Sequence, residues 1–446
     1  MEKNKTICAI STPIGNGGIS IVRMTGEKSK KILQKLVEID VEKLEPRKLT
    51  LSKIHTKNFD EQALVVWFKA PYSYTGEDMV EIQCHGGIVI ANGILNQLLE
   101  SGATLAEAGE FTKRAFVNGK ISLDKAEGVI DMINAQSEEA VKAGYNLLVG
   151  KLKETVDNIQ SSLTDAQAKL EVAIDYPEED IEFATSKEIK TEIENASKQI
   201  EELLSTANTG RIVKNGINVL ILGKPNAGKS SLLNALVGYN RAIVTDIAGT
   251  TRDTIEDTYV YNNMSFNVID TAGIRNAESI VERIGIERAE ENVKSADIVL
   301  VVLDGSRPIE EDDQKILSLV KDKIVLYVIN KIDLPKKINA TFDKMIEVSA
   351  LRRERVEKLK KDIYDLVVDK NMLNGGLLIT NTRHVNALNR ANQSLKSAIN
   401  EIDMSTPLDL VATDLKSAWL ALGEITGKNS NQEIIDTIFT KFCLGK

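Results

Sequence analysis

Residues 223–230 constrain the fold of this chain more than any other segment, because they read Gly-Lys-Pro-Asn-Ala-Gly-Lys-Ser, with the spacing G-x-x-x-x-G-K-S. The apolar run 218–222 before them is typical of a buried strand, and 231–236 after them is typical of a helix. This setting predicts a phosphate-binding loop in which backbone N–H groups surround the phosphates. We expect Lys229 to contact the β- and γ-phosphates and the Ser230 hydroxyl to bind Mg²⁺. A chance glycine-rich turn is the competing interpretation.

A second motif predicts further phosphate contacts. The tetrapeptide Asp-Thr-Ala-Gly at 270–273 follows the apolar run 266–269. An aspartate at Asp270 can hold Mg²⁺ through water, and Gly273 lets its backbone N–H approach the γ-phosphate.

Two more motifs, each placed after an apolar run, identify the base. Asn-Lys-Ile-Asp at 330–333 follows 324–329, and Ser349 and Ala350 follow a third run. The Asp333 carboxylate can accept hydrogen bonds from guanine N1–H and N2–H, whereas adenine has no matching donors. A backbone N–H near Ala350 can meet guanine O6. The sequence therefore predicts a guanine nucleotide, GTP or GDP, bound at one edge of a sheet.

The arrangement of apolar residues predicts several domains. Buried-strand runs alternate with helical segments from residue 217 to about 368, as in a parallel sheet built from β–α–β units. Long helical stripes precede and follow this region, and Gly210 is expected to end one of them. We predict an α/β multidomain chain: an α+β N-terminal domain (1–118), an all-α helical domain in two parts (119–213 and 373–446) and, inserted in it, a P-loop GTPase domain with a parallel sheet (214–372).

Composition limits the partners of the chain. Its 446 residues include 56 Lys+Arg and 65 Asp+Glu, and the net charge of -9 argues against a broad basic surface for nucleic acid. No apolar run approaches the ~18 residues that span a bilayer, and the N-terminal residues do not form a secretory signal. Three cysteines fit a reducing compartment better than a disulfide framework. We expect a cytoplasmic protein with no membrane partner.

The residues available for hydrolysis differ from those of the small regulatory GTPases. Those proteins carry Gln directly after their D-x-x-G motif, whereas this chain has Ile274, which cannot orient water. Glu282 is the nearby candidate for that task. The plain alternative is an exposed glutamate at the start of a helix.

The loop at 245–253, Thr-Asp-Ile-Ala-Gly-Thr-Thr-Arg-Asp, offers ligands for cations. Thr251 can bind Mg²⁺ when GTP orders the loop. A monovalent cation that neutralises phosphate charge could be enclosed by oxygens of Asn226, Thr245, Ile247 and Thr250. Arg252 and Arg275 are rival positive groups, and Asn226 capping its own loop is the plain alternative.

With these motifs together, the chain resembles, over its whole length, the MnmE (TrmE) family of bacterial tRNA modification GTPases. The N-terminal stretches that carry the resemblance are Ile-Val-Arg at 21–23, Tyr-Thr-Gly-Glu-Asp at 74–78, His-Gly-Gly at 85–87 and Gly-Glu-Phe-Thr at 109–112. The closing stretch 439–446, Phe-Thr-Lys-Phe-Cys-Leu-Gly-Lys, is the most family-specific, although Leu444 replaces the usual Ile.

The resemblance implies an activity and partners. Family members are homodimers with a folate-binding and dimerising N-terminal domain. With the FAD-dependent partner MnmG they add an aminomethyl or carboxymethylaminomethyl group to C5 of the wobble uridine, position 34, of certain tRNAs. The one-carbon unit comes from a tetrahydrofolate derivative, 5-formyl- or methylene-tetrahydrofolate. Hydrolysis is activated when two G domains meet around K⁺ and the nucleotide.

The resemblance also implies roles for individual residues. It assigns K⁺ to Asn226, Thr245, Ile247 and Thr250, assigns Mg²⁺ to Ser230 and Thr251, and makes Glu282 the catalytic residue that orients water. The implied folate contacts are Arg23, Glu81, Lys120 and Lys446, each of which would otherwise be an ordinary surface charge. The predicted GTP-binding residues are Asn226, Ala227, Gly228, Lys229, Ser230, Ser231, Thr245, Asp246, Ile247, Ala248, Gly249, Thr250, Thr251, Asp270, Thr271, Ala272, Gly273, Asn330, Lys331, Asp333, Ser349 and Ala350.

Two questions stay open at the level of sequence. Cys443 is either a nucleophile near the one-carbon site or a small buried apolar residue. Besides GTP-driven tRNA modification, the chain could be a switch GTPase in ribosome assembly, or a folate-binding scaffold whose GTPase only times the docking of a partner. The N-terminal motifs and the closing stretch favour tRNA modification.

Overall fold

The computed structural model describes residues 5–175, 179–238, 257–270, 291–368 and 376–446. The chain divides into two compact units. Unit 1 combines residues 1–130, 147–182 and 406–446, and unit 2 combines residues 131–146 and 183–405. Each unit therefore draws on segments that are far apart in the sequence.

Unit 1 contains a six-stranded sheet with the strand order β3-β4-β5-β2-β1-β6. Neighbouring strands are antiparallel except β1 and β6, which are parallel. The strands are β1 (Ile7–Ile10), β2 (Ile19–Thr25), β3 (Thr50–His55), β4 (Asp60–Phe68), β5 (Met79–His85) and β6 (Thr104–Leu105).

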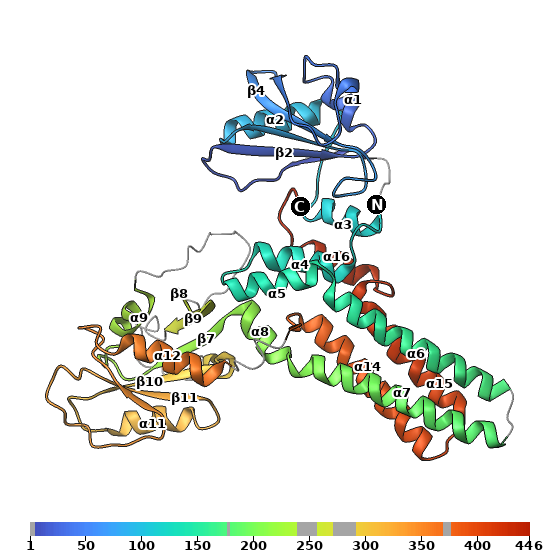
Figure 1. The fold of residues 1–446 in the computed structure, drawn as a ribbon. Helices are drawn as coiled ribbons and strands as arrows, with labels where there is room; N and C mark the ends of the chain where they lie inside the picture. Colours follow the sequence, from blue (N-terminus) through green and yellow to red (C-terminus); the bar gives the residue numbers. More distant parts are fainter. Residues whose placement is uncertain (1–4, 176–178, 239–256, 271–290, 369–375) are drawn as a thin grey trace, which may run out of the picture. The chain divides into compact units, whose positions relative to one another are not determined.

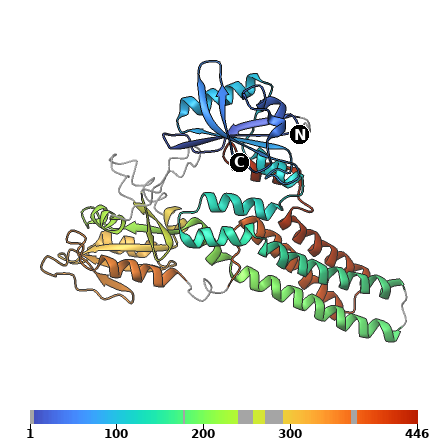
Figure 2. The same ribbon diagram turned by 45° about the horizontal axis from the view of Figure 1, so that its top comes forward.

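Apolar side chains alternate along these strands, so one face of the sheet is buried. In β5 the residues Val80, Ile82 and Cys84 join the hydrophobic core, as the alternation predicts, and Glu81 faces the other side. Helices α1 (Ser29–Leu33) and α2 (Ile88–Glu100) cover the buried face, and Figure 2 shows α2 lying along the sheet. A short 3-10 helix, η1 (Val41–Lys43), completes this core.

The C-terminal part of the chain packs against earlier helices within unit 1. Helices α6 and α15 lie side by side (Figure 1), and the Gln160 side-chain amide donates a hydrogen bond to the Trp419 carbonyl at 2.8 Å. The predicted stripe of α6, from Leu152 to Leu170, is buried there. Besides α1 and α2, the α-helices that belong wholly or partly to unit 1 in the described ranges are α3 (Glu110–Val117), α4 (Leu123–Ile133), α5 (Glu138–Leu148), α6 (Lys151–Asp175), α7 (Glu179–Ser205), α15 (Leu408–Thr426) and α16 (Gln432–Phe439).

Unit 2 contains the predicted parallel sheet, with the strand order β12-β11-β10-β7-β9-β8. All neighbouring strands are parallel except β8, which is antiparallel to β9. The strands are β7 (Ile217–Leu222), β8 (Asp257–Tyr261), β9 (Met264–Asp270), β10 (Ile298–Asp304), β11 (Val325–Asn330) and β12 (Met345–Glu347).

Both faces of this sheet are covered, which explains why its strands are continuous apolar runs. Helices α9 (Lys229–Val237) and α12 (Val356–Val367) pack on one face, and α11 (Glu311–Leu319) packs on the other (Figure 1). Odd-numbered residues of β7, such as Val219, face α9, and even-numbered residues, such as Leu220, face the other side.

Helices on either side of the inserted sheet also pair within unit 2. Helix α14 (Thr382–Asp403) packs on α7, and the Ser197 hydroxyl donates to the Asn392 side-chain oxygen at 2.6 Å. The predicted packing of the two helical blocks is therefore observed, whereas the domain boundaries at 118, 213 and 372 stay predictions. None of the helices in the described ranges has the length and apolar character needed to cross a bilayer.

Gly210 does not end a helix, so that expectation is wrong. Helix α7 ends at Ser205, and Gly210 lies inside the next helix, α8 (Ala207–Asn215). A Cβ atom on Gly210 would lie 2.2 Å from the carbonyl oxygen of Ile379. The glycine is needed because two backbone segments approach closely at this point.

We expect Gly210→Ala to lower the stability of the chain by about 1–3 kcal/mol, the usual effect of overpacking. Calorimetric unfolding of the full chain measures the effect as a lower Tm. Gly15→Ala is the control, because nothing lies within 4 Å of a Cβ atom at Gly15. Equal melting temperatures for the two variants would contradict the close approach.

Candidate functional site: the nucleotide-binding edge and the Arg23 site

The predicted phosphate loop lies between β7 and α9. Gly228, with φ 97°, precedes the helix, and Asn226 also has a left-handed backbone, with φ 64°. The Lys229 ammonium donates to the carbonyls of Gly223 at 2.7 Å and Lys224 at 2.9 Å, which holds it over the loop. The loop therefore has the geometry expected for phosphate binding, with a cation at its centre and a helix N-terminus beneath it.

Asn330 connects this loop to the loop that follows β12. Its side-chain N–H donates to the Ala227 carbonyl, and its side-chain oxygen accepts from the Ala350 N–H, both at 3.0 Å. Asn330 is 2% exposed, and a Cβ atom on Gly228 would lie 2.2 Å from its amide nitrogen. The amide therefore requires a glycine at 228. The Ala350 N–H, one of the backbone donors in the segment predicted to meet guanine O6, is bonded to Asn330 within the protein.

The predicted base-binding carboxylate is held by the second of these loops. The Ser349 hydroxyl donates to an oxygen of Asp333 at 2.6 Å, and this hydrogen bond lowers the pKa of the Asp333 carboxyl. Asp333 is therefore kept as a carboxylate, the form that accepts hydrogen bonds from guanine.

Sequence reasoning missed Asp304, which ends the strand β10. Its carboxylate accepts a hydrogen bond from the Lys331 ammonium at 2.7 Å, and it lies opposite Asn330 across the parallel ladder. Burial raises the pKa of Asp304, but hydrogen bonds from Lys331 and Ser306 outweigh burial and hold the pKa below its usual value. An acidic residue directly after a buried strand was the available signal, because parallel strands end at one edge.

Other predicted residues of this site fall wholly or partly outside the description. Asp270 ends β9 at the same edge, opposite Ile221 of β7. The loop 245–251, residues 271–273 and Glu282 lie outside the described residues.

A second site brings together three of the four predicted folate contacts. The Arg23 guanidinium binds the Glu81 carboxylate through two nitrogens, each at 2.8 Å, and donates to the Gly445 carbonyl at 3.2 Å. Burial, and then the Arg23 charge, lower the pKa of the Lys446 ammonium. Two cations, Arg23 and Lys446, thus lie close to the Glu81 carboxylate in this half-buried site.

Aromatic rings flank the Arg23 guanidinium, and its central carbon lies 5.9 Å from the ring centre of Tyr74 and 5.8 Å from that of Phe111. The fourth predicted contact, Lys120, is held by the loop that carries Tyr74. Its ammonium donates to the Pro71 carbonyl at 2.9 Å, and its side chain lies along Gly76.

Of the three cysteines, only Cys443 is exposed. The buried interpretation of Cys443 is therefore wrong. Burial raises the pKa of the Cys8 thiol to about 12 and that of the Cys84 thiol to about 11.

Comparisons with known proteins agree with the motifs. The model of the GTP-binding protein TrmE N-terminus matches residues 6–120, and that of the MnmE helical domain matches residues 123–443. The tRNA modification GTPase MnmE of Clostridioides difficile is 42% identical to this chain over 99% of both chains. Those of Lactobacillus gasseri (99% of this chain, 98% of that protein) and Thermotoga maritima (99% and 100%) are 44% and 43% identical. The chain belongs to the MnmE family of tRNA modification GTPases.

Membership of the MnmE family confirms the resemblance, the α/β multidomain fold with a P-loop domain, and the enzyme class, a GTP hydrolase. The roles of individual residues stay predictions, supported by the geometry around Lys229, Asn330 and Asp333.

We expect Asp333→Asn to weaken GTP binding about 10- to 100-fold, because the substitution removes charge-assisted hydrogen bonds to the base. Xanthosine triphosphate should gain relative affinity, because the new amide N–H can donate to the xanthine O2. Competition binding against a labelled guanine nucleotide measures both effects, with exposed Asp322→Asn as the control. If xanthosine triphosphate gained nothing over GTP, Asp333 would not read the base.

Proposed function

We propose that this chain hydrolyses GTP in order to drive, together with the FAD-dependent protein MnmG, the addition of an aminomethyl or carboxymethylaminomethyl group to C5 of the wobble uridine of certain tRNAs. Relatives that match almost the whole chain are named tRNA modification GTPases. The observation that carries the proposal is that a chain of this family combines a guanine-type nucleotide site with a separate, cation-rich site at Arg23. A protein that acts on tRNA would work in the cytoplasm.

The described residues support GTP binding directly. Lys229 supplies a fixed positive charge for the β- and γ-phosphates, and the start of α9 supplies backbone N–H groups. Asp333 supplies the acceptor for the base, and Asn330 keeps the two loops together. These contacts orient the triphosphate at the sheet edge where hydrolysis would take place.

Two predicted cation ligands are among the described residues. The exposed Asn226 and Ser230 present an amide and a hydroxyl on the phosphate loop, and oxygen donors suit hard cations. We infer Mg²⁺ at Ser230 and Thr251, and K⁺ at Asn226, Thr245, Ile247 and Thr250. When bound, these ions would neutralise charge that develops on the phosphates.

The Arg23 site fits a tetrahydrofolate derivative, by the chemistry of its donors. Such a ligand has a flat, polar ring edge and negatively charged carboxylates. Glu81 would accept from the amino edge of the ring, while Arg23, Lys446 and Lys120 would bind carboxylates or carbonyl oxygens. A bound folate would supply the one-carbon unit. The role of the chain is to bind and orient it at Arg23, next to Tyr74 and Phe111.

We further propose a homodimer whose two G domains meet around K⁺ and GTP. Ile274 cannot orient water, so Glu282 takes that role. Pairing of the G domains would exclude bulk solvent around the attacking water and couple hydrolysis to motion that serves the tRNA chemistry.

We expect GTP turnover to be at least about 10-fold faster in K⁺ than in Na⁺ at equal ionic strength. A cation that takes the place of an arginine finger has a large effect on the rate of hydrolysis. Steady-state phosphate release measures the rate, and nucleotide binding in both salts is the control. Asn226→Ala should remove the difference. Equal rates in the two salts for the unmodified protein would contradict the cation site.

We expect Glu282→Ala to slow hydrolysis about 100-fold or more while GTP still binds, because a positioned acid–base group is worth that much. The nearby Glu278→Ala is the matched control. In cells that depend on the variant, the wobble uridine should stay unmodified. Near-normal turnover in Glu282→Ala would exclude Glu282 as the catalytic residue. If hydrolysis were lost but tRNA modification stayed normal, modification would not depend on GTP hydrolysis.

A further inference from the structure

Two N-terminal motifs supply the aromatic rings beside Arg23, and each also carries a glutamate, Glu77 or Glu110, that has no role in the chemistry above. The segment 74–78 carries Tyr74, and the segment 109–112 carries Phe111, the two rings on either side of the Arg23 guanidinium. The Phe111 N–H also donates to the Lys446 carbonyl at 3.2 Å. The position of these two segments therefore decides the shape of the site.

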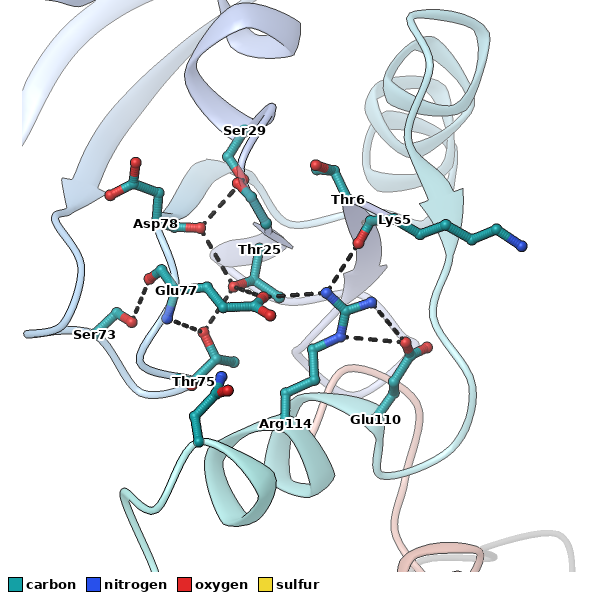
Figure 3. Close-up of polar contacts among 12 residues, drawn as sticks. Lys5, Thr6, Thr25, Ser29, Ser73, Thr75, Glu77, Asp78, Glu110 and Arg114 are labelled. Atoms are coloured by element: carbon teal, nitrogen blue, oxygen red, sulfur yellow. Dashed lines mark hydrogen bonds and ion pairs between the residues drawn. The ribbon is translucent and has the colours of Figure 1, made fainter. Parts of the chain in front are cut away.

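Arg114 binds both segments at once, as Figure 3 shows. One nitrogen of its guanidinium donates to the Glu77 carboxylate at 3.1 Å, and another donates to the Glu110 carboxylate at 2.8 Å. The first nitrogen also donates to the Lys5 carbonyl at 2.9 Å. The Arg114 side chain is 8% exposed, whereas its partners Glu77 and Glu110 are 26% and 14% exposed, so the guanidinium is the most buried member of this ion pair network.

Further hydrogen bonds hold the Glu77 end of the network and join the two segments. The Glu77 carboxylate accepts from the Thr25 hydroxyl at 3.2 Å, and the hydroxyls of Thr25 and Thr75 lie 2.7 Å apart in buried surroundings (Figure 3). The hydroxyls of Tyr74 and Thr112 lie 2.9 Å apart, which is a second connection between the segments. The segment 74–78 and the start of α3, at 109–112, are thus held together.

We propose that Arg114 is a positioning residue for the Arg23 site. By binding Glu77 and Glu110 together, it fixes Tyr74 and Phe111 against Arg23 and, through the Phe111 amide, holds residues 445–446 there. This inference rests on the proposed folate site for its ligand, but the holding of residues 445–446 is a property of the protein alone.

Geometry explains why an arginine is needed. The planar fork reaches two carboxylates and a carbonyl in different directions, whereas a lysine ammonium offers one point charge. Removing one member of a buried network leaves the other charges uncompensated, so Arg114→Met could unfold the domain. Arg114→Lys and Glu110→Gln are milder changes, because the first keeps the positive charge and the second keeps the volume and a polar side chain, while each removes part of the network.

The test uses the full chain and two measurements. Hydrogen–deuterium exchange follows the peptides around Phe111 and residues 440–446, and calorimetric titration measures binding of 5-formyltetrahydrofolate. Glu42→Gln is the matched control, because Glu42 forms an exposed ion pair with Lys30 at 3.0 Å in the same unit. We expect Arg114→Lys and Glu110→Gln to raise hydrogen exchange in those two peptides. Each should also weaken binding of 5-formyltetrahydrofolate about 10-fold, which corresponds to the loss of one charge-assisted hydrogen bond. The strands β4 and β5 should keep the exchange of the unmodified protein.

Each outcome has one meaning. Unchanged exchange around residues 440–446 in both variants would overturn the positioning role, and so would a rise spread evenly over the whole sheet, which signals general destabilisation. If the unmodified protein fails to bind 5-formyltetrahydrofolate, the proposed folate site is wrong. The exchange measurement then still decides whether Arg114 holds residues 445–446.

Discussion

Parallel pairing of β7, β10, β11 and β12 is the constraint on which the nucleotide site depends. Because the ladder fixes the register, the strands end at one edge, where Asp304 lies opposite Asn330. Asn330 then joins the phosphate loop to the loop after β12 through the two polar atoms of a single buried amide. The element that binds phosphate and the element that binds the base are therefore held as one body.

Positive charge in a half-buried setting defines the second site. Arg23 and Lys446 both lie close to the Glu81 carboxylate, and the lowered pKa of Lys446 reflects burial and the neighbouring Arg23 charge. The hydrogen bond from Arg23 to the Gly445 carbonyl and the contacts of Arg23 with the two rings offset part of the repulsion between the cations. A bound anion would favour the charged form of Lys446 and raise its pKa again. An anionic group beside Arg23 and Lys446 would offset the repulsion between these two cations.

Local chemistry explains which features could be predicted from the sequence. The phosphate loop and Asp333 were readable because each function lies within a few residues and follows a recognisable strand. The Arg23–Glu81 pair spans 58 residues, and the Arg23–Gly445 contact spans 422, so no periodicity reveals them. Arg23 and Glu81 were predicted only through the family resemblance, as separate folate contacts, and their contact with each other was not predicted. Arg114 and Glu110 are four residues apart on a helix, but their third partner, Glu77, comes from another segment.

Failures of the sequence interpretation have the same origin. Gly210 looked like a helix end, but the need for glycine comes from the Ile379 carbonyl, which belongs to a distant segment. Asp304 was overlooked because its partner, Lys331, lies on the neighbouring strand's loop. Cys443 is exposed, and the sequence around a lone cysteine does not indicate whether its side chain is buried. Contacts between distant segments, rather than local propensity, account for each difference.

The central claim is that GTP hydrolysis by this chain serves a chemical change on a tRNA base. The most direct test is mass-spectrometric nucleoside analysis of total tRNA from cells without the protein, compared with the same cells carrying the intact gene. The account predicts that the C5-modified wobble uridine disappears in the deletion and returns with the gene. An unchanged nucleoside profile in the deletion would contradict it.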